Sequence, residues 1–284
     1  MLNIELNSIK VAETIVELQQ LINKKNGKTV GFVPTMGFLH EGHLSLVKHA
    51  KEQNDIVVMS IFVNPAQFGP GEDFESYPRD LERDVRLAEE AGVNILFIPS
   101  VQEMYPFEGG IRILPGPQAD ELCGASRPGH FDGVLKVVLK LFNIIDPDRS
   151  YFGMKDAQQL AIIETFVRDF NLRTKIMRVP IVREVDGLAK SSRNVNLTPE
   201  ERNQAPIIHQ ALLKGAKLHS NGMKPEQIEI EVANYITEGS TGQIDYVKML
   251  SYPNLQPVTN ETNEVILAVA VKFSKTRLID NIIM

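Results

Sequence analysis

The sequence lacks the features of secreted and membrane-spanning proteins. It contains a single cysteine, Cys123, so no disulfide can form within the chain, and a reducing compartment is expected. No histidine partner for Cys123 can be argued from spacing, which favours a structural thiol over a nucleophile. No uncharged apolar run is long enough to cross a bilayer, and the first residues show no secretory signal pattern. The sequence therefore predicts a cytoplasmic protein with no membrane partner.

An excess of positive charge is also absent. The chain has 30 Lys and Arg against 36 Asp and Glu, and its net charge of −6 argues against a broad nucleic-acid surface. With 43% hydrophobic and 23% charged residues, the composition is that of an ordinary globular protein and not of a disordered one. The length of 284 residues is enough for two modest domains or one large one.

Residues 30–47 form the most informative stretch. A β-branched and aromatic run over residues 29–33 predicts a strand, which we expect Pro34 to end. Glycines then mark a turn, and an amphipathic helix is expected to begin near His43. A junction of this kind presents unpaired backbone N–H groups and the positive end of a helix dipole, and both suit phosphate.

Two histidines give this junction its chemistry. His40 and His43 are three residues apart, so both can face the same anion. Imidazoles can donate hydrogen bonds to phosphate oxygens and oppose the charge that develops when a phosphorus centre is attacked. A structural histidine and a metal-binding pair are the alternatives. A metal site would need a third ligand, and no His, Cys or carboxylate stands at a readable spacing.

The rest of the N-terminal part alternates apolar runs with helical patterns. A dense apolar run such as residues 55–63 is typical of a parallel sheet buried on both faces. We expect helices over residues 8–23, 81–91, 134–145 and 154–170, strands over residues 55–63, 93–98 and 173–182, and irregular structure over residues 109–129.

Polar residues at the ends of these strands are candidates for ligand binding, because ligands of open α/β sheets lie outside the carboxyl ends of the strands. Asn64 and Gln67 follow the strand over residues 55–63, and their alternative is a turn that faces water. Lys155 is a candidate phosphate ligand, and Gln159 would lie one turn further along the same helix face.

Charged loops add two further candidate groups. Asp73, Asp80 and Asp84 are able to approach a magnesium–phosphate group, since hard cations prefer oxygen ligands, although a solvated acidic face is the alternative. The loop over residues 183–194 carries a lysine, two hydroxyls and an arginine in succession, which can bind a polyphosphate. An exposed basic loop is the alternative for that segment.

The pattern changes at Thr198. Thr198 and Pro199, followed by two glutamates, predict a helix start with Thr as the N-cap and Pro at the first helical position. Helical patterns run to residue 219 and over residues 225–238, and strand-like runs follow over residues 244–250 and 264–273. The expected fold class is α/β, with a parallel-sheet domain over residues 1–180 and a smaller α+β domain over residues 181–284.

Taken together, the motifs resemble the pantoate–β-alanine ligase (pantothenate synthetase) family, and the resemblance spans nearly the whole chain. The matching segments are Pro34-Thr35-Met36-Gly37, His40-Glu41-Gly42-His43, Phe62-Val63-Asn64-Pro65, Gln67-Phe68, Arg127-Pro128-Gly129-His130-Phe131, Tyr151-Phe152-Gly153, Lys155-Asp156, Gln158-Gln159, Asp186-Gly187, Ser191-Ser192-Arg193-Asn194 and Arg277-Leu278-Ile279-Asp280-Asn281.

The resemblance implies a Rossmann-like nucleotide- and pantoate-binding domain with a C-terminal lid domain, a magnesium ion that accompanies ATP, and a homodimer. Members of the family use a His-x-Gly-His turn and join pantoate to β-alanine in two steps. The pantoate carboxylate attacks the α-phosphorus of ATP, giving pantoyl adenylate and pyrophosphate. The amine of β-alanine then attacks the acyl carbon, releasing AMP and pantothenate.

The resemblance also implies roles for individual residues. His43 and His40 would be catalytic, Gln67, Gln159, Met36 and Asn64 would hold pantoate or β-alanine, and Asp84 would lie near the metal. The residues implied for ATP are Met36, Gly37, Phe38, Leu39, His40, Glu41, Gly42, His43, Gly153, Met154, Lys155, Asp156, Val182, Lys190, Ser191, Ser192 and Arg193.

One position departs from the family, and two other functions compete with the ligase. Met154 stands where relatives commonly carry a charged or polar side chain, which bears on ATP affinity if that side chain contacts the nucleotide. The first competitor is an adenylyltransferase that stops at an adenylated product. The second is a nucleotide-binding regulatory protein without turnover, which would be expected to lose His43, Lys155 or the Ser191–Arg193 loop.

Overall fold

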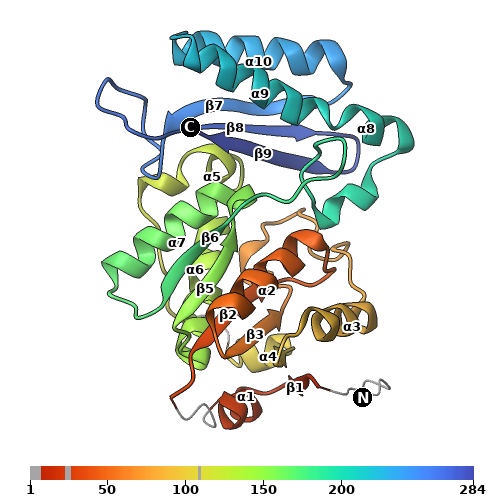
Figure 1. Cartoon of the computed structure of the whole chain (residues 1–284), viewed down its shortest axis with the longest axis vertical. Coiled ribbons are helices and arrows are strands. Elements are labelled where there is room, and N and C mark those ends of the chain that lie inside the picture. Colours follow the sequence, from red (N-terminus) through yellow and green to blue (C-terminus); the bar gives the residue numbers. More distant parts are fainter. Residues whose placement is uncertain (1–7, 23–26, 108–109) are drawn as a thin grey trace. The chain divides into compact units, whose positions relative to one another are not determined.

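The computed structural model describes residues 8–22, 27–107 and 110–284 (Figure 1). The chain forms two compact units, and neither is one continuous stretch. The first comprises Met1–Pro115, Arg127–Gly153 and Ile163–Val179, and the second comprises Gly116–Ser126, Met154–Ile162 and Pro180–Met284. The chain passes into the second unit for the last time at Pro180, and two earlier segments also belong to that unit.

The first unit is built on a six-stranded parallel sheet with the strand order β1-β4-β3-β2-β5-β6. Its strands are β1 (Lys10–Ala12), β2 (Val30–Thr35), β3 (Ile56–Ile61), β4 (Ile95–Phe97), β5 (Arg149–Gly153) and β6 (Lys175–Val179). The chain runs outward from β2 through β3 to β4, then returns to the other side of β2 as β5. The strand order therefore reverses between β2 and β5, the place where open α/β sheets bind ligands.

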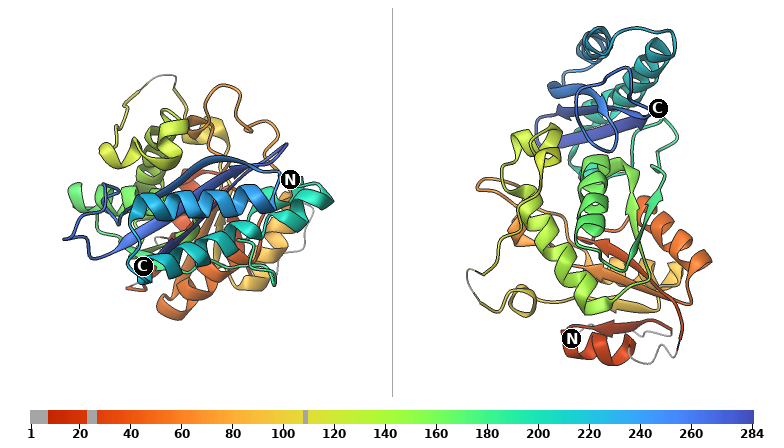
Figure 2. Two further views of the ribbon diagram at one scale, coloured as in Figure 1. Left: turned by 90° about the horizontal axis from the view of Figure 1, so that it is seen from above. Right: turned by 90° about the vertical axis from the view of Figure 1, so that its left-hand side faces the viewer.

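Helices cover both faces of this sheet, because successive side chains of a strand point to opposite faces. Val33 and Met59 belong to the core that α2 (Glu41–Gln53) and α3 (Leu81–Ala91) close. Phe32 lies on the other face, in edge-on contact with Phe142 of α6 (His130–Ile145). Figure 2 shows α2 and α6 on opposite sides of the sheet. The predicted parallel α/β arrangement is confirmed.

Pro34 does not end β2, contrary to the prediction. The strand continues to Thr35, and Pro34 pairs with Ser60 of β3. The carbonyl of Thr35 accepts from Phe62 on the β3 side. Successive residues of a strand direct their backbone polar groups to opposite sides, so the N–H that Pro34 lacks would face β5. Pairing with β5 ends earlier, at Phe32, and no ladder hydrogen bond is lost there.

The helix predicted over residues 8–23 is wrong in its first half. Residues 10–12 form β1, which pairs in parallel with β4, and the helix α1 spans only Ile15–Ile22. Ser8 does not cap it; the Ser8 N–H and hydroxyl both donate to Glu89. The pairing with β4 outweighs a helical periodicity that Lys10, Val11 and Ala12 also satisfy. The predicted end at Asn23 lies outside the described residues.

The second unit contains an antiparallel sheet of β7 (Gln243–Ser251), β8 (Val265–Lys272) and β9 (Arg277–Ile283). α9 (Ile207–Ser220) and α10 (Pro225–Gly239) lie side by side on one face of it (Figures 1 and 2). The sequence predicted β7 and β8 but not β9. α8 (Pro199–Gln204) begins at the predicted cap, where Thr198 and Glu201 form a capping box.

The remaining elements are short or connect the larger ones. These elements are η2 (Pro65–Gln67), α4 (Val101–Met104), η3 (Pro117–Ala119), α5 (Leu122–Ser126), η4 (Met154–Asp156), α7 (Ala157–Asp169) and η5 (Ser192–Asn196). Residues 109–129 were predicted to be irregular, but where they are described they contain two short helices, Pro117–Ala119 and Leu122–Ser126. Within the described ranges, no helix has the length and apolar character needed to span a membrane.

Candidate active site

The turn from β2 to α2 places two imidazole rings against each other. His40 is the N-cap of α2, and its Nδ1 accepts from the Gly42 N–H at 3.1 Å. The Nδ1 of His43 accepts from the His40 N–H at 3.3 Å, and the ring centroids are 4.0 Å apart. Because both Nδ1 atoms act as acceptors, each neutral ring carries its proton on Nε2. The turn thus combines helix N-terminal N–H groups with two imidazole donors.

The side chain of Asp84 holds this turn in place. It is 1% exposed, and its two oxygens accept the backbone N–H groups of Phe38 and Leu39, each at 2.7 Å. Phe38 has a φ of +50°, in the left-handed region that side chains other than Gly rarely adopt. At Gly37, with φ +85°, an added Cβ would lie 3.0 Å from Asp84 Oδ2. A buried carboxylate therefore stabilises an unusual backbone conformation directly before the histidines.

The environment of Asp84 fits this holding role better than direct metal ligation. Burial raises the pKa of Asp84 above its usual value, although the N–H groups of Leu39 and Phe38 act to lower it. Both carboxylate oxygens are already engaged by backbone donors. Over residues 8–22, 27–107 and 110–284, no group of three or more His, Cys, Asp or Glu side chains is arranged to hold a metal ion. The residues described here therefore do not fit a resident magnesium site.

The loop after β3 contains the next candidates, and the structure distinguishes their roles. Asn64 is buried, donates to Gln67 Oε1 at 3.0 Å and to the Gly133 carbonyl at 3.1 Å, and accepts from the hydroxyl of Tyr105 at 2.8 Å. Gln67 is 9% exposed, and its Nε2 lies 3.4 Å from the sulfur of Met36. Asn64 thus orients Gln67, which is the better placed of the two to reach a ligand.

Three further side chains support this loop, although the sequence pointed to no separate role for them. Arg127 forms a two-point ion pair with Glu72, with distances of 2.9 and 2.6 Å, and also contacts His130 Nε2 at 3.0 Å. His130 donates from Nδ1 to the carbonyl of Gln67 at 2.8 Å. Burial acts to raise the pKa of Glu72, but Arg127, together with the Gly69 N–H and His130, lowers it overall. The motif over residues 127–131, which contains Arg127 and His130, was visible in the sequence; the partners Glu72 and Gln67 were not.

In the second unit, Lys155 lies in η4, directly before α7. Its ammonium is 4.0 Å from Asp156, and it lines a narrow cavity together with Ser191 and Asn194. The backbone on both sides of it is held by Asn281 of β9, whose Nδ2 donates to the carbonyls of Met154 at 3.0 Å and Lys155 at 2.9 Å. The structure thus brings together Lys155 and the Ser191 loop, two segments predicted to bind ATP.

The 182–194 segment folds back on itself. The N–H of Lys190 donates to the carbonyl of Val182 at 2.9 Å, and the ammonium of Lys190 pairs with Glu184 at 2.7 Å. Ser191 caps η5 by accepting from the N–H of Arg193 at 3.3 Å. These contacts order a short segment that carries the basic side chain of Lys190 and the hydroxyls of Ser191 and Ser192.

Two adjacent glutamines on α7 differ in their surroundings. Gln158 is buried; it accepts from the Cys123 N–H at 2.9 Å and donates to the carbonyls of Gln118 and Glu121 at 2.9 and 2.6 Å. Gln159 is half-buried on the same first turn. Gln158 is therefore structural, and Gln159 keeps its candidacy for substrate binding.

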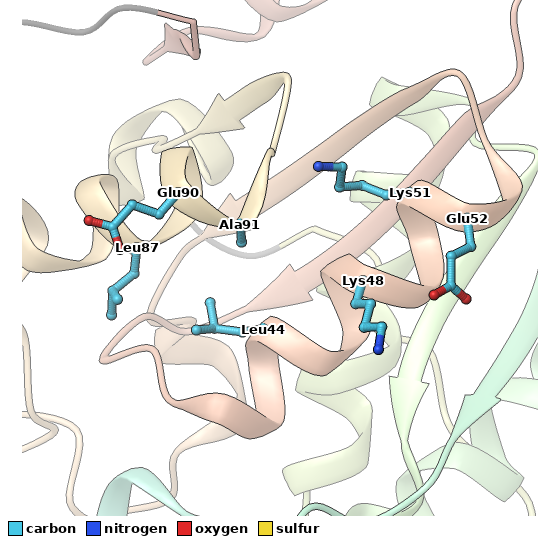
Figure 3. Close-up of a pocket in the computed structure, with 7 residues that line it drawn as sticks. All are labelled: Leu44, Lys48, Lys51, Glu52, Leu87, Glu90 and Ala91. Atoms are coloured by element: carbon cyan, nitrogen blue, oxygen red, sulfur yellow. The ribbon is translucent and has the colours of Figure 1, made fainter.

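The other predicted residues occupy these same segments. Gly153 ends β5, and Met154 and Asp156 lie in η4; Asp156 is exposed and Met154 half-buried. Glu41 and Gly42 open α2, and Ser192 is buried at the start of η5. A separate groove between α2 and α3 contains none of the predicted site residues (Figure 3). It is lined by Leu44, Lys48, Lys51, Glu52, Leu87, Glu90 and Ala91.

Comparison with known proteins decides the family. The model of the pantoate-beta-alanine ligase family matches residues 10–283. The chain belongs to this family. It is an enzyme, a ligase that forms a carbon–nitrogen bond, and its reaction is the ATP-dependent ligation of pantoate to β-alanine.

Individual relatives agree with this assignment along almost their whole length. A pantothenate synthetase of Lysinibacillus sphaericus (strain C3-41) is 59% identical over 276 residues, covering 96% of this chain and 97% of that protein. One from Bacillus subtilis (strain 168) is 55% identical over 272 residues, covering 95% of each.

Solved structures agree with the fold. The crystal structure of pantothenate synthetase from Thermus thermophilus has a TM-score of 0.91 at 44% identity, covering 96% of this chain and 99% of that one. The pantoate-beta-alanine ligase of Francisella tularensis, complexed with beta-gamma ATP and beta-alanine, has a TM-score of 0.81 at 36% identity and covers 97% of each chain. The predicted fold class, a Rossmann-like α/β domain with a smaller α+β domain, is thereby confirmed.

Proposed function

We propose that the chain performs the ligation through pantoyl adenylate, with the β2–α2 turn as the site of phosphoryl chemistry. The pantoate carboxylate attacks the α-phosphorus of ATP and pyrophosphate leaves. The amine of β-alanine then attacks the acyl carbon, AMP leaves, and the amine loses a proton. The observation that supports this most directly is the pair of adjacent histidine rings, 4.0 Å apart, at the N-terminus of α2, next to the point where the strand order reverses.

His43 and His40 are proposed as catalytic residues. With Nδ1 of each ring accepting from a backbone N–H, each neutral ring carries its proton on Nε2, and we propose that this N–H donates to the phosphate of bound ATP. Such donors oppose the negative charge that builds on the phosphate oxygens during attack. The start of α2 adds the positive end of the helix dipole, which favours a phosphate.

The remaining ATP contacts are assigned unit by unit. In the first unit, residues 36–43 and Gly153 are proposed to contact the nucleotide. In the second unit, Lys155 and Lys190 supply positive charge, Ser191, Ser192 and Arg193 supply hydrogen-bond donors, and the backbone of Val182 meets the base. Met154 and Asp156 belong to the same turn as Lys155. Met154 contributes through its backbone in this proposal.

Pantoate is proposed to bind through amide groups, which bond its hydroxyls and carboxylate without adding charge. Gln67 and Gln159 are the contacting residues, with Met36 beside Gln67. Asn64 acts by orienting Gln67, because its own amide is already bonded to Gln67 and to the Gly133 carbonyl. β-Alanine is proposed to enter after the adenylate has formed.

The magnesium ion is proposed to arrive with the phosphates of ATP, since the described residues do not form a resident site for it. Asp84 is proposed to support the turn before His40 and not to ligate the metal directly. A homodimer, a cytoplasmic location and a lid function of the C-terminal domain, residues 181–284, complete the proposal on the strength of the family resemblance alone.

The test is pyrophosphate release by the purified protein with ATP and magnesium, first alone, then with pantoate, and then with pantoate and β-alanine. Pyrophosphate that requires pantoate, followed by AMP and pantothenate once β-alanine is added, is the expected result. A stable adenylated end product that β-alanine does not consume would indicate an adenylyltransferase instead. Folded protein that binds ATP without releasing pyrophosphate under any condition would contradict the proposal.

A further inference from the structure

Asp280 and Asn281, two consecutive residues of β9, each hold one of the ATP-binding segments proposed for the second unit. Both side chains are buried, with 4% and 5% exposure. Neither was assigned a role from the sequence beyond membership of a family motif. Asn281 bonds the turn that carries Lys155, and Asp280 bonds the base of the segment that carries Lys190.

The two hydrogen bonds of Asn281 fix the direction of the Lys155 side chain. The Met154 carbonyl belongs to the peptide plane before the Cα of Lys155, and the Lys155 carbonyl belongs to the plane after it. Each plane is rigid, so fixing both leaves the backbone angles φ and ψ of Lys155 little freedom. A single amide nitrogen, bonded at 3.0 and 2.9 Å, therefore orients the Cα–Cβ bond of the lysine.

Asp280 fixes the second segment in the same way. Its carboxylate forms a two-point ion pair with Arg183, at 2.6 and 2.9 Å. Arg183 is paired with Ala189 across the base of the 182–190 fold-back, and it also donates to the Gly187 carbonyl at 3.0 Å. Lys190 and Ser191 directly follow Ala189 in the chain. The ion pair thus attaches the base of this segment to β9.

The strand joins these two attachments through one stiff length of backbone. Asp280 also accepts the Asn281 N–H at 2.8 Å, and both residues are paired to β8, with Val269 and Ala268 as their partners. Lys155, Ser191 and Asp280 line one narrow cavity. The spacing between the two segments is therefore set by adjacent residues of a buried strand and not by either segment alone.

We propose that Asn281 and Asp280 are positioning residues for ATP, with Asn281 acting through Lys155 and Asp280 through the Arg183 fold-back. This inference rests on the proposed role of Lys155 in ATP binding. Neither residue is proposed to touch the nucleotide. Removing the amide of Asn281 leaves Lys155 in the chain but releases its backbone, so affinity for ATP falls.

The decisive measurement is the affinity for MgATP, determined by calorimetry. Pantoate is left out so that no turnover interferes. Asn281→Leu keeps the branched shape and removes the donors; Asn281→Asp keeps shape and polarity and also removes them. Both are expected to weaken MgATP binding about tenfold, the scale of losing two backbone-holding hydrogen bonds. Comparing the two separates lost donors from an added negative charge.

A double-mutant cycle with Lys155→Met tests whether Asn281 acts through the lysine. If it does, Asn281→Leu causes no further loss of MgATP affinity once Lys155 is replaced, because coupled residues are not additive. Additive losses would overturn the proposal, since they would place the effect of Asn281 elsewhere. Unchanged MgATP affinity in folded Asn281→Leu and Asn281→Asp proteins would overturn it as well.

Glu229→Ala is the matched control for a general loss of stability. Glu229 accepts the Met249 N–H at 2.8 Å from its position on α10, a helix that carries neither of the two ATP-binding segments. The variant is expected to have a lower unfolding temperature and an unchanged MgATP affinity. If Lys155→Met itself leaves MgATP affinity unchanged, the proposed function of Lys155 fails; if only the Asn281 variants do, the positioning role alone fails.

Discussion

His43 is the residue on which the proposed chemistry depends most directly, because its Nδ1 is occupied by the His40 N–H and its Nε2–H is aimed by that bond. His43→Ala is expected to lower the rate of pantoate-dependent pyrophosphate release by about 10²-fold or more, the scale of one lost transition-state donor. Single-turnover quench experiments measure this rate without the second step.

The same helix offers a matched control. His49 also lies on α2, where its Nδ1 contacts the Ser45 carbonyl at 2.8 Å, away from the turn. His49→Ala is expected to adenylate pantoate at the normal rate. A His43→Ala protein that kept normal single-turnover adenylation would remove His43 from the catalytic assignment.

The role of Asp84 can also be tested by substitution, because a carboxylate at this position can either hold the turn or bind the metal. Asp84→Asn replaces one acceptor oxygen with an amide donor that faces a backbone N–H. The loss of one hydrogen bond, with a buried N–H left unsatisfied, is expected to destabilise the protein by about 1–3 kcal/mol and to raise the KM for ATP. Urea unfolding and steady-state kinetics measure the two effects.

Magnesium titration separates the two roles of Asp84. If Asp84 holds the turn, the raised KM for ATP persists at every magnesium concentration. Recovery of a normal KM when magnesium is in large excess would instead make Asp84 a metal ligand. The sequence could not decide between these roles, since the choice depends on burial and on the backbone donors of Phe38 and Leu39, which are distant from Asp84 in the chain.

Residue types and spacing indicated which loops carry polar candidate residues, but not which side chains hold other side chains in place. Asn64 and Gln67 looked equivalent in the sequence. The structure uses the amide of Asn64 to orient Gln67, and the partners that require this, Tyr105 and Gly133, are distant in the chain. The same holds for Gln158 and Gln159, of which only the first is tied to residues 118–123.

Among the elements, the start of α8 gives a prediction that depends on pH. Hydrogen bonds lower the pKa of Glu201 from 4.5 to about 2, with the largest effect from the Thr198 N–H and a smaller one from Ser274. A carboxylate whose pKa is depressed by folding stabilises the protein above its unfolded pKa, and this contribution is lost as the pH falls toward the folded value. We therefore expect the stability of the native protein to decline between about pH 4.5 and pH 2 in part because of Glu201.

Glu201→Gln removes this titration and keeps an acceptor for the cap. The free energy of unfolding of the variant, measured by urea titration at several pH values, is expected to fall less steeply with decreasing pH in that window. Glu200→Gln, in the same first turn, is the matched control. Parallel pH profiles for Glu201→Gln and the native protein would contradict the assignment.

Elements were predicted where local signals and tertiary pairing agree. α3 begins and ends at the predicted residues because Asp80 caps it and Gly92 closes it with φ +86°. β1 was mistaken for helix since only its pairing with β4 distinguishes the two. β9 was missed because Asp280 and Asn281 interrupt its apolar pattern, and their polarity is explained only by Arg183 and the η4 carbonyls.

For the whole molecule, binding of the substrate should stabilise the native state. At free MgATP one hundred times its Kd, the stabilisation is expected to be about 2.7 kcal/mol. Thermal unfolding with and without MgATP measures it as a rise in Tm. Since magnesium is proposed to enter with ATP, EDTA should reduce the rise with ATP and leave the Tm of the ligand-free protein unchanged. A fall in that Tm would indicate a resident metal instead.

The class of the fold followed from the sequence, but the division of the chain did not. Buried apolar strands separated by helices predict a parallel sheet, and a change of pattern near residue 180 predicts a second fold. Contacts of Leu122, Ala157 and Ala161 draw two early segments into the second unit, where they share a core with Tyr252 and Ile266. No local signal at residues 116–126 or 154–162 indicates such distant partners.

This interleaving has a consequence for biosynthesis. As the chain leaves the ribosome, the first unit is complete at Val179, yet Ala157 and Leu122 have no core until Leu250 and Tyr252 are made. At about 5–20 residues per second, the wait for Leu250 after Ala157 is roughly 5–20 s. During that time a nascent chain carries apolar surface on the start of α7. Slowing translation between residues 180 and 250 would lengthen the interval in which this surface stays uncovered.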